Sequence, residues 1–148
     1  MATLSSKPLA ALAALVIKRG VSLGGLAFEA RAQVLALVWA GLPAAPMTER
    51  QINDSLRAQL AGVVACLDTD HVELRRWLVD AGWLTRDGFG REYRRRPLSE
   101  LPASLQALAT PLLALALPDW VAQAESAQAA QREAHRQAWQ AGQASRDA

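Results

Sequence analysis

Residues 70–97 decide the fold, and they read DHVELRRWLVDAGWLTRDGFGREYRRRP. Asp70 is a typical N-cap residue directly before a run with helical periodicity. Gly82 stands where a left-handed C-terminal cap is expected, and Trp83 after it can pack back on the helix. The stretch therefore begins with a predicted helix over 71–81.

The two sides of this predicted helix differ in character, because successive residues are about 100° apart around the axis. The side expected to face the core carries Leu74, Leu78 and Ala81, flanked by His71 and Trp77. The opposite side carries Val72, Arg76 and Val79. Arg75 lies on one flank, with Glu73 and Asp80 on the other.

After Trp83, β-favouring and aromatic residues flank the glycine-rich connection Asp87-Gly88-Phe89-Gly90, and Pro97 ends the second run. This pattern predicts a β-hairpin over 83–96. A helix followed by a hairpin is typical of a winged-helix domain, in which helix 71–81 is the recognition helix and the hairpin is the wing.

Arginine dominates the predicted hairpin, where five arginines against two acidic residues leave a net charge of +3. The five are Arg86, Arg91, Arg94, Arg95 and Arg96. Such a wing is suited to contacts with DNA phosphates. The alternative is a solvated edge whose arginines pair with Glu49, Glu73 or Asp80.

The predicted recognition helix adds Arg75 and Arg76 to the candidate nucleic-acid-binding residues. Glu73 and Asp80 on the same helix would repel phosphates. If an acidic neighbour holds Arg75, that side chain fixes the helix against the wing, and Arg76 is then the best candidate for a base or phosphate contact.

The chain is expected to have a mainly α fold and to divide into three regions. Residues 1–21 hold a structural helix, 22–96 a winged-helix-like domain with one β-hairpin, and 97–148 a helical C-terminal extension with a frayed end. A helix is predicted over 28–39, and the next helix is expected to begin at a capping box, Thr48-Glu49-Arg50-Gln51, and to continue through Gly62 to Leu67. In the C-terminal extension, Pro111 is expected to break or kink the helix that contains it, and a last helix is predicted from Pro118 to about Gly142. Ile52, Leu56, Leu74, Leu78 and Tyr93 are expected to share one core.

The segments TERQINDSL (48–56), DHVELRRWLVDAGWLTR (70–86) and GREYRR (90–95) resemble the bacterial domain of unknown function 2087. The resemblance covers about residues 22 to 96. It implies a winged-helix-like fold and an association with transcriptional regulators.

Composition excludes several classes of protein. The chain has 148 residues, 51% of them hydrophobic, and a net charge of +2. The lone Cys66 excludes an internal disulfide and a cysteine-based zinc cluster, and the two histidines, His71 and His135, are far apart in sequence. We expect no enzyme activity, catalytic residue, metal or cofactor.

The apolar run from Leu9 to Ile17 is too short to span a membrane and lacks a cleavage site, so we expect a cytoplasmic protein with no membrane partner. The favoured function is a DNA-binding or transcription-regulatory module that contacts duplex DNA. The alternative is a protein-interaction module that uses Trp77, Trp83, Phe89 and the C-terminal helix, which could also pair with a second copy of the chain.

Overall fold

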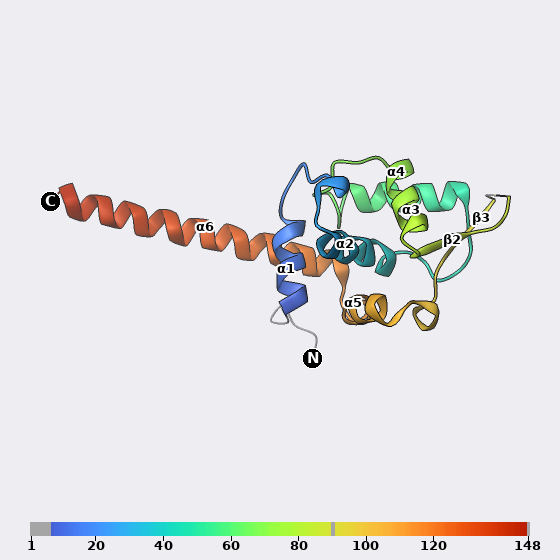
Figure 1. Cartoon of the computed structure of the whole chain (residues 1–148). Coiled ribbons are helices and arrows are strands. Elements are labelled where there is room, and N and C mark those ends of the chain that lie inside the picture. Colours follow the sequence, from blue (N-terminus) through green and yellow to red (C-terminus); the bar gives the residue numbers. More distant parts are fainter. Residues whose placement is uncertain (1–6, 90, 148) are drawn as a thin grey trace.

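A computed structural model describes residues 7–89 and 91–147 (Figure 1). The helices are α1 (Lys7–Val16), α2 (Phe28–Ala40), α3 (Glu49–Leu60), α4 (His71–Asp80), α5 (Ala103–Leu113) and α6 (Leu117–Asp147). The strands are β1 (Met47–Thr48), β2 (Leu84–Arg86) and β3 (Glu92–Arg95), and the short 3-10 helices are η1 (Leu23–Gly25) and η2 (Leu98–Glu100). A mainly helical fold with a hairpin and a helical C-terminal extension was predicted, and this is confirmed.

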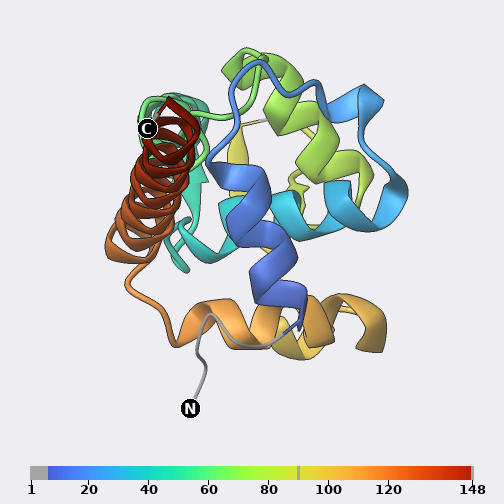
Figure 2. The ribbon, with the colours of Figure 1, turned by 90° about the vertical axis from the view of Figure 1, so that its left-hand side faces the viewer.

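Helix α2 lies at the centre of the molecule, with α1 and α5 on one side and α4 on another (Figures 1 and 2). All residues from Val34 to Trp39 are buried, which explains why this helix is apolar around most of its circumference. Helix α5 packs on α2. The predicted break at Pro111 is wrong, because α5 continues to Leu113. The proline removes one helical N–H donor and lies only two residues before the end of the helix.

Helix α3 begins at the predicted capping box. The Gln51 backbone N–H donates to Thr48 Oγ1 at 3.2 Å, and the Thr48 backbone N–H donates to Gln51 Oε1 at 2.9 Å. The predicted continuation to Leu67 is wrong, because α3 ends at Leu60. Beyond that point Val21 and Leu67 form a parallel bridge, in which the Val21 N–H donates to the Cys66 carbonyl and the Asp68 N–H donates to the Val21 carbonyl. A contact distant in sequence therefore replaces the helix.

Helix α4 has the predicted caps at both ends. Asp70 Oδ1 accepts from the Glu73 backbone N–H at 2.8 Å. At the other end, Gly82 has a φ of +84°, and the Trp83 N–H donates to the Leu78 carbonyl, which completes a Schellman motif. Ala81 is exposed, contrary to the prediction, because the chain turns at Gly82 and the buried Trp83 takes the core position instead.

The predicted hairpin is present, with β2 and β3 paired in the register Leu84↔Arg95 and Arg86↔Tyr93. A third strand was not predicted: β1 pairs with β3 through Met47↔Tyr93, which places β3 in the middle of the sheet. The predicted shared core is confirmed, because Ile52, Leu56, Leu74, Leu78 and Tyr93 are all buried in the same hydrophobic cluster.

Helix α6 packs only its first turns on the rest of the molecule, where Leu117, Trp120, Val121 and Ala124 are buried. From there it projects away from the end that carries the hairpin, and it runs beyond Gly142 to Asp147 (Figures 1 and 2). Among the described residues, no single helix is long and apolar enough to cross a membrane. Helices α5 and α6 meet that test only as a pair bent by 82°.

Candidate nucleic-acid interface

Helix α4 and the hairpin enclose a cleft of about 410 Å³ that brings together several predicted site residues. The cleft is lined by Val72, Arg75, Arg76, Val79, Asp80, Arg86 and Tyr93. Arg76 and Arg86 are both exposed, one on the helix and one on β2. Two arginines that are distant in sequence thus meet at one opening, although Asp80 adds a negative charge to the same cleft.

Arg75 points inward from α4, and its side chain is only 16% exposed. Its Nη1 atom lies 2.6 Å from Asn53 Oδ1 and 3.5 Å from Glu49 Oε1, both on α3. Its guanidinium carbon is 5.2 Å from the centre of the Tyr93 ring. Arg75 therefore ties α4 to both α3 and β3, the role expected if an acidic neighbour holds it.

Arg95 also points inward, from β3. Its Nη1 atom donates to the Leu42 carbonyl at 2.9 Å, and its guanidinium carbon lies 4.6 Å from the centre of the Trp39 ring. Partial burial lowers the pKa of Arg95 from its ordinary value. These contacts fasten the sheet to the C-terminal end of α2.

Arg96 continues this attachment through its backbone and its side chain. The Trp39 indole N–H donates to the Arg96 carbonyl at 2.8 Å, and Arg96 Nη1 donates to the Gly82 carbonyl at 3.3 Å. We call Arg75, Arg95 and Arg96 the inner arginines.

Four predicted site residues instead extend from the surface, and we call them the outer arginines: Arg76, Arg86, Arg91 and Arg94. Within the described residues, none of their guanidinium groups forms an ion pair or a hydrogen bond. The guanidinium carbon of Arg91 lies 5.8 Å from the ring centre of Phe89, a side chain that is 83% exposed.

Asp87 organises the turn that carries Phe89 and Arg91. Its Oδ1 atom accepts from the Arg91 backbone N–H at 2.8 Å, and its own N–H donates to the Glu92 carbonyl at 3.0 Å. Such a side-chain cap holds a connection in one shape. Gly90, the last residue of the predicted connection, lies outside the described residues.

His71, Cys66 and Trp83 lie among residues of the fold. His71 Nε2 lies 3.4 Å from Arg57 Nη2, and Cys66 is buried, which raises the pKa of its thiol. Trp83 is only 1% exposed and cannot form part of a binding surface, so its predicted role in protein interaction is wrong. In the described part of the chain, no cluster of His, Cys, Asp and Glu is suited to a metal ion.

The sequence reasoning overlooked the inward position of Arg95, although a signal was present. Side chains alternate between the two faces of a strand. Tyr93 is buried, so Arg95, two residues later, shares its face, whereas Arg94 points the opposite way.

Residues 27–95 match a family model described as an uncharacterized protein conserved in bacteria (DUF2087). No curated protein and no solved structure matches the chain. The match runs from the start of α2 to the end of β3 and lies within residues 22–96, where the motifs predicted it. The part of the chain that carries α4 and the hairpin is therefore similar to this bacterial family.

Proposed function

We propose that α2 to β3 form a winged-helix module that binds duplex DNA in the bacterial cytoplasm and acts in transcription regulation. The order helix, short strand, two helices and hairpin supports this proposal, as does a sheet whose first strand pairs with the last. In this arrangement α4 is the recognition helix and β2–β3 is the wing.

The observation that carries the proposal is the set of outer arginines, which are exposed on α4 and on the hairpin. Arg76 and Arg86 share the cleft between these two elements, and Arg94 is exposed farther along β3. Because these guanidinium groups form no ion pair and no hydrogen bond within the described residues, contact with phosphate would not require an internal ion pair to break.

The proposal assigns different parts to the two sets of arginines. Arg86, Arg91 and Arg94 contact the phosphate backbone, and Arg76 contacts a base edge or a phosphate from α4. The inner arginines hold the sheet and α4 in position and do not touch DNA. Asp80 and Glu92 limit the attraction. Because most of the proposed contacts are with phosphates, we expect binding that weakens steeply as salt rises.

The test is fluorescence anisotropy of the full chain with mixed-sequence duplex DNA across a series of salt concentrations. Replacing Arg86, Arg91 and Arg94 together by glutamine should weaken binding to all sequences and reduce the salt slope by about one for each phosphate that is no longer bound by an arginine. The matched control replaces three exposed arginines of α6, Arg132, Arg136 and Arg146, and changes the net charge equally. Equal reductions in affinity for the two variants, or no binding by the parent chain, would contradict the proposal.

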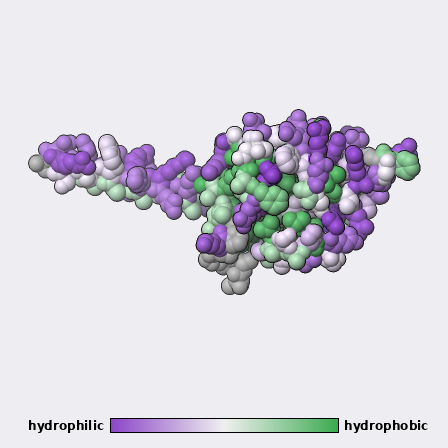
Figure 3. Space-filling model, in the orientation of Figure 1, coloured by the Kyte–Doolittle hydropathy of each residue, from purple (hydrophilic) through white to green (hydrophobic). Residues whose placement is uncertain are grey.

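A second candidate function, pairing of two copies through α6, rests on a separate observation. When the heptad position a is placed at Leu117, every Asp, Glu and Arg of α6 falls at b, c or f. The a and d positions are mostly alanine, at 124, 127, 134, 138 and 141. Figure 3 shows a paler strip along the otherwise hydrophilic projecting helix.

A charge-free face of this kind is suited to close packing of two helices. Light scattering of the full chain should then give the mass of a dimer, and Ala134→Glu with Ala138→Glu should return it to a monomer. The control replacements Ser126→Glu with Ala129→Glu, at c and f positions, should leave the dimer intact. A monomeric parent chain would exclude this candidate.

A further inference from the structure

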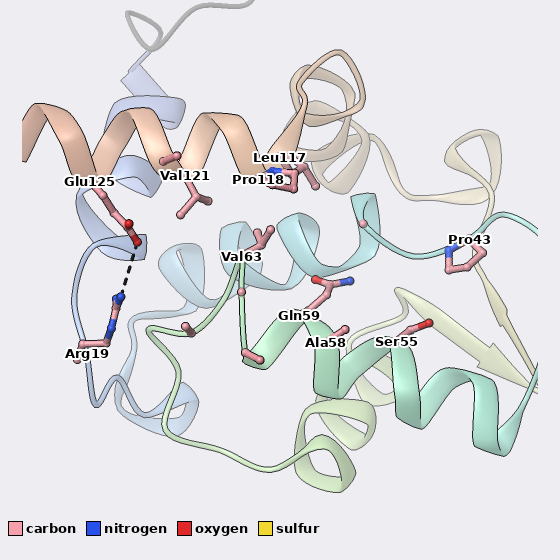
Figure 4. A pocket seen from close by; sticks show the side chains of 15 residues that line it. Arg19, Pro43, Ser55, Ala58, Gln59, Val63, Leu117, Pro118, Val121 and Glu125 are labelled. Carbon is pink, nitrogen blue, oxygen red and sulfur yellow. Dashed lines mark ion pairs between the residues drawn. The ribbon is translucent and has the colours of Figure 1, made fainter.

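A second cavity, larger than the cleft between α4 and the hairpin, lies between the C-terminal part of α3 and the first turns of α6 (Figure 4). Its volume is about 760 Å³. Small-molecule sites in proteins typically occupy about 300 to 1,000 Å³. The cavity is therefore large enough for a metabolite of modest size.

Most of the residues that line this cavity are apolar, and several of them are small. They include Ala58, Ala61 and Gly62 from α3 and the turn after it, and Leu117, Val121 and Ala122 from α6. The small residues on the α3 side leave room between the helices, and the larger apolar residues of α6 face the same space. Such walls favour the hydrocarbon part of a ligand.

Two opposite charges stand at one end of the cavity (Figure 4). Arg19 Nη2, from the segment after α1, lies 3.6 Å from Glu125 Oε1 on α6, and the side chains are 60% and 50% exposed. An exposed ion pair of this length contributes little to stability, so it can open for a ligand at low cost.

The signs of these charges restrict the ligand. A simple anion that paired with Arg19 would be repelled by Glu125, and a simple cation that paired with Glu125 would be repelled by Arg19. A zwitterion can pair with both and leaves no charge without a partner.

A polar side chain, that of Gln59, lies in the wall of the same cavity. Gln59 Nε2 donates to the Val38 carbonyl at 2.9 Å, and Oε1 of the same amide is buried without a hydrogen-bond partner in the described residues. Gly41 makes this position possible, because a Cβ atom there would lie only 2.9 Å from Gln59 Nε2. The Gln59 side chain therefore joins α3 to α2 and holds this wall of the cavity in place.

We propose that this cavity binds a hydrophobic α-amino acid. Its carboxylate pairs with Arg19, its ammonium group pairs with Glu125, and its side chain lies between α3 and α6. None of the residues that line the cavity belongs to α4 or the hairpin, so this site does not depend on the DNA-binding proposal.

Isothermal titration calorimetry of the full chain tests the ligand class, with L-leucine and L-phenylalanine as probes. Three analogues of leucine each lack one feature: 4-methylpentanoate lacks the ammonium group, 3-methylbutylamine lacks the carboxylate, and glycine lacks the side chain. At least one probe should bind with one molecule per chain. Each analogue should bind at least about tenfold more weakly than that probe, or show no binding. No heat from either probe up to about 10 mM, where a millimolar site would be occupied, would overturn the proposal. Equal binding of the analogues would also overturn it.

Substitutions test the location. Ala122→Phe should fill the cavity and abolish binding, whereas Ala129→Phe places the same side chain on an exposed part of α6 outside the cavity and should leave binding unchanged. Arg19→Gln and Glu125→Gln should each weaken binding about tenfold, and Glu125→Gln should reduce the preference for leucine over 4-methylpentanoate. Circular dichroism checks that each variant is folded. Unaltered binding in folded Ala122→Phe would overturn the assignment to this cavity.

Discussion

The inner and outer sides of α4 and the hairpin carry the same types of residue in different surroundings. On the inner side, Leu78 is buried and Arg95 lies against the Trp39 ring with a hydrogen bond to the Leu42 carbonyl. On the outer side, Val72 is partly exposed and Arg94 extends into solvent. The residue type alone therefore does not reveal whether a side chain serves the fold or is free to bind a partner.

The difference changes the meaning of the hairpin's charge. The net charge of +3 counts every charged residue of the hairpin sequence. Arg95 and Arg96, however, donate hydrogen bonds to the backbone carbonyl groups of Leu42 and Gly82. The surface available to a polyanion is set mainly by Arg86, Arg91 and Arg94, together with Arg76 of α4. Three matched pairs of substitutions test this division.

The largest difference is expected between the apolar residues of α4. Leu78→Ala leaves a cavity in the core and should lower the free energy of unfolding by about 2 to 5 kcal/mol. Val72→Ala removes a side chain that is 43% exposed and should change it by less than about 0.5 kcal/mol. Urea unfolding followed by circular dichroism measures both. A decrease below about 0.5 kcal/mol for Leu78→Ala would show that the inner side is wrongly assigned.

The second pair compares neighbouring arginines of β3. Arg95→Ala removes a charged hydrogen-bond donor from the Leu42 carbonyl and the stack on Trp39, and it should cost about 1.5 to 3 kcal/mol. Arg94→Ala should cost less than about 0.5 kcal/mol, because its side chain is exposed. The same urea experiment measures this pair. Similar decreases in stability at the two positions would remove the distinction between inner and outer arginines.

Features determined by neighbouring residues could be predicted from the sequence. The capping box at Thr48, the Asp70 cap and the left-handed Gly82 each depend on a few consecutive residues, and each is present. The alternation of side chains along β3 is equally local and would have placed Arg95 beside the buried Tyr93.

Features that depend on distant contacts could not be predicted in this way. The segment after α3 has helical spacing of its apolar residues, but its backbone pairs with Val21 instead. Strand β1 exists only because Met47 lies beside Tyr93. Within the candidate site, the sequence showed the charge of Arg75 and Arg95, but it did not show that Asn53 and Trp39 are their partners.

The smallest of the three differences is expected between Arg75 and Arg76, adjacent residues that lie about 100° apart around the axis of α4. Arg75→Ala removes the short hydrogen bond to Asn53, the ion pair with Glu49 and the contact with the Tyr93 ring, and it should lower the free energy of unfolding by about 1 to 2 kcal/mol. The expected effect lies below that for Arg95 because Glu49 and Asn53 regain water when the arginine is replaced, whereas the Leu42 carbonyl lies beside a buried residue. Arg76→Ala should leave stability within about 0.5 kcal/mol of the parent and change only DNA affinity.

A double-mutant cycle with Asn53→Ala isolates the interaction that distinguishes these two arginines. Arg75 and Asn53 should be coupled by about 0.5 to 1.5 kcal/mol, because their side chains touch, whereas Arg76 and Asn53 should be additive. If Arg75 showed no coupling to Asn53 and Arg75→Ala weakened DNA binding as strongly as Arg76→Ala, Arg75 would belong with the outer arginines. In that case the surface of α4 proposed to contact DNA would extend across both of its arginines.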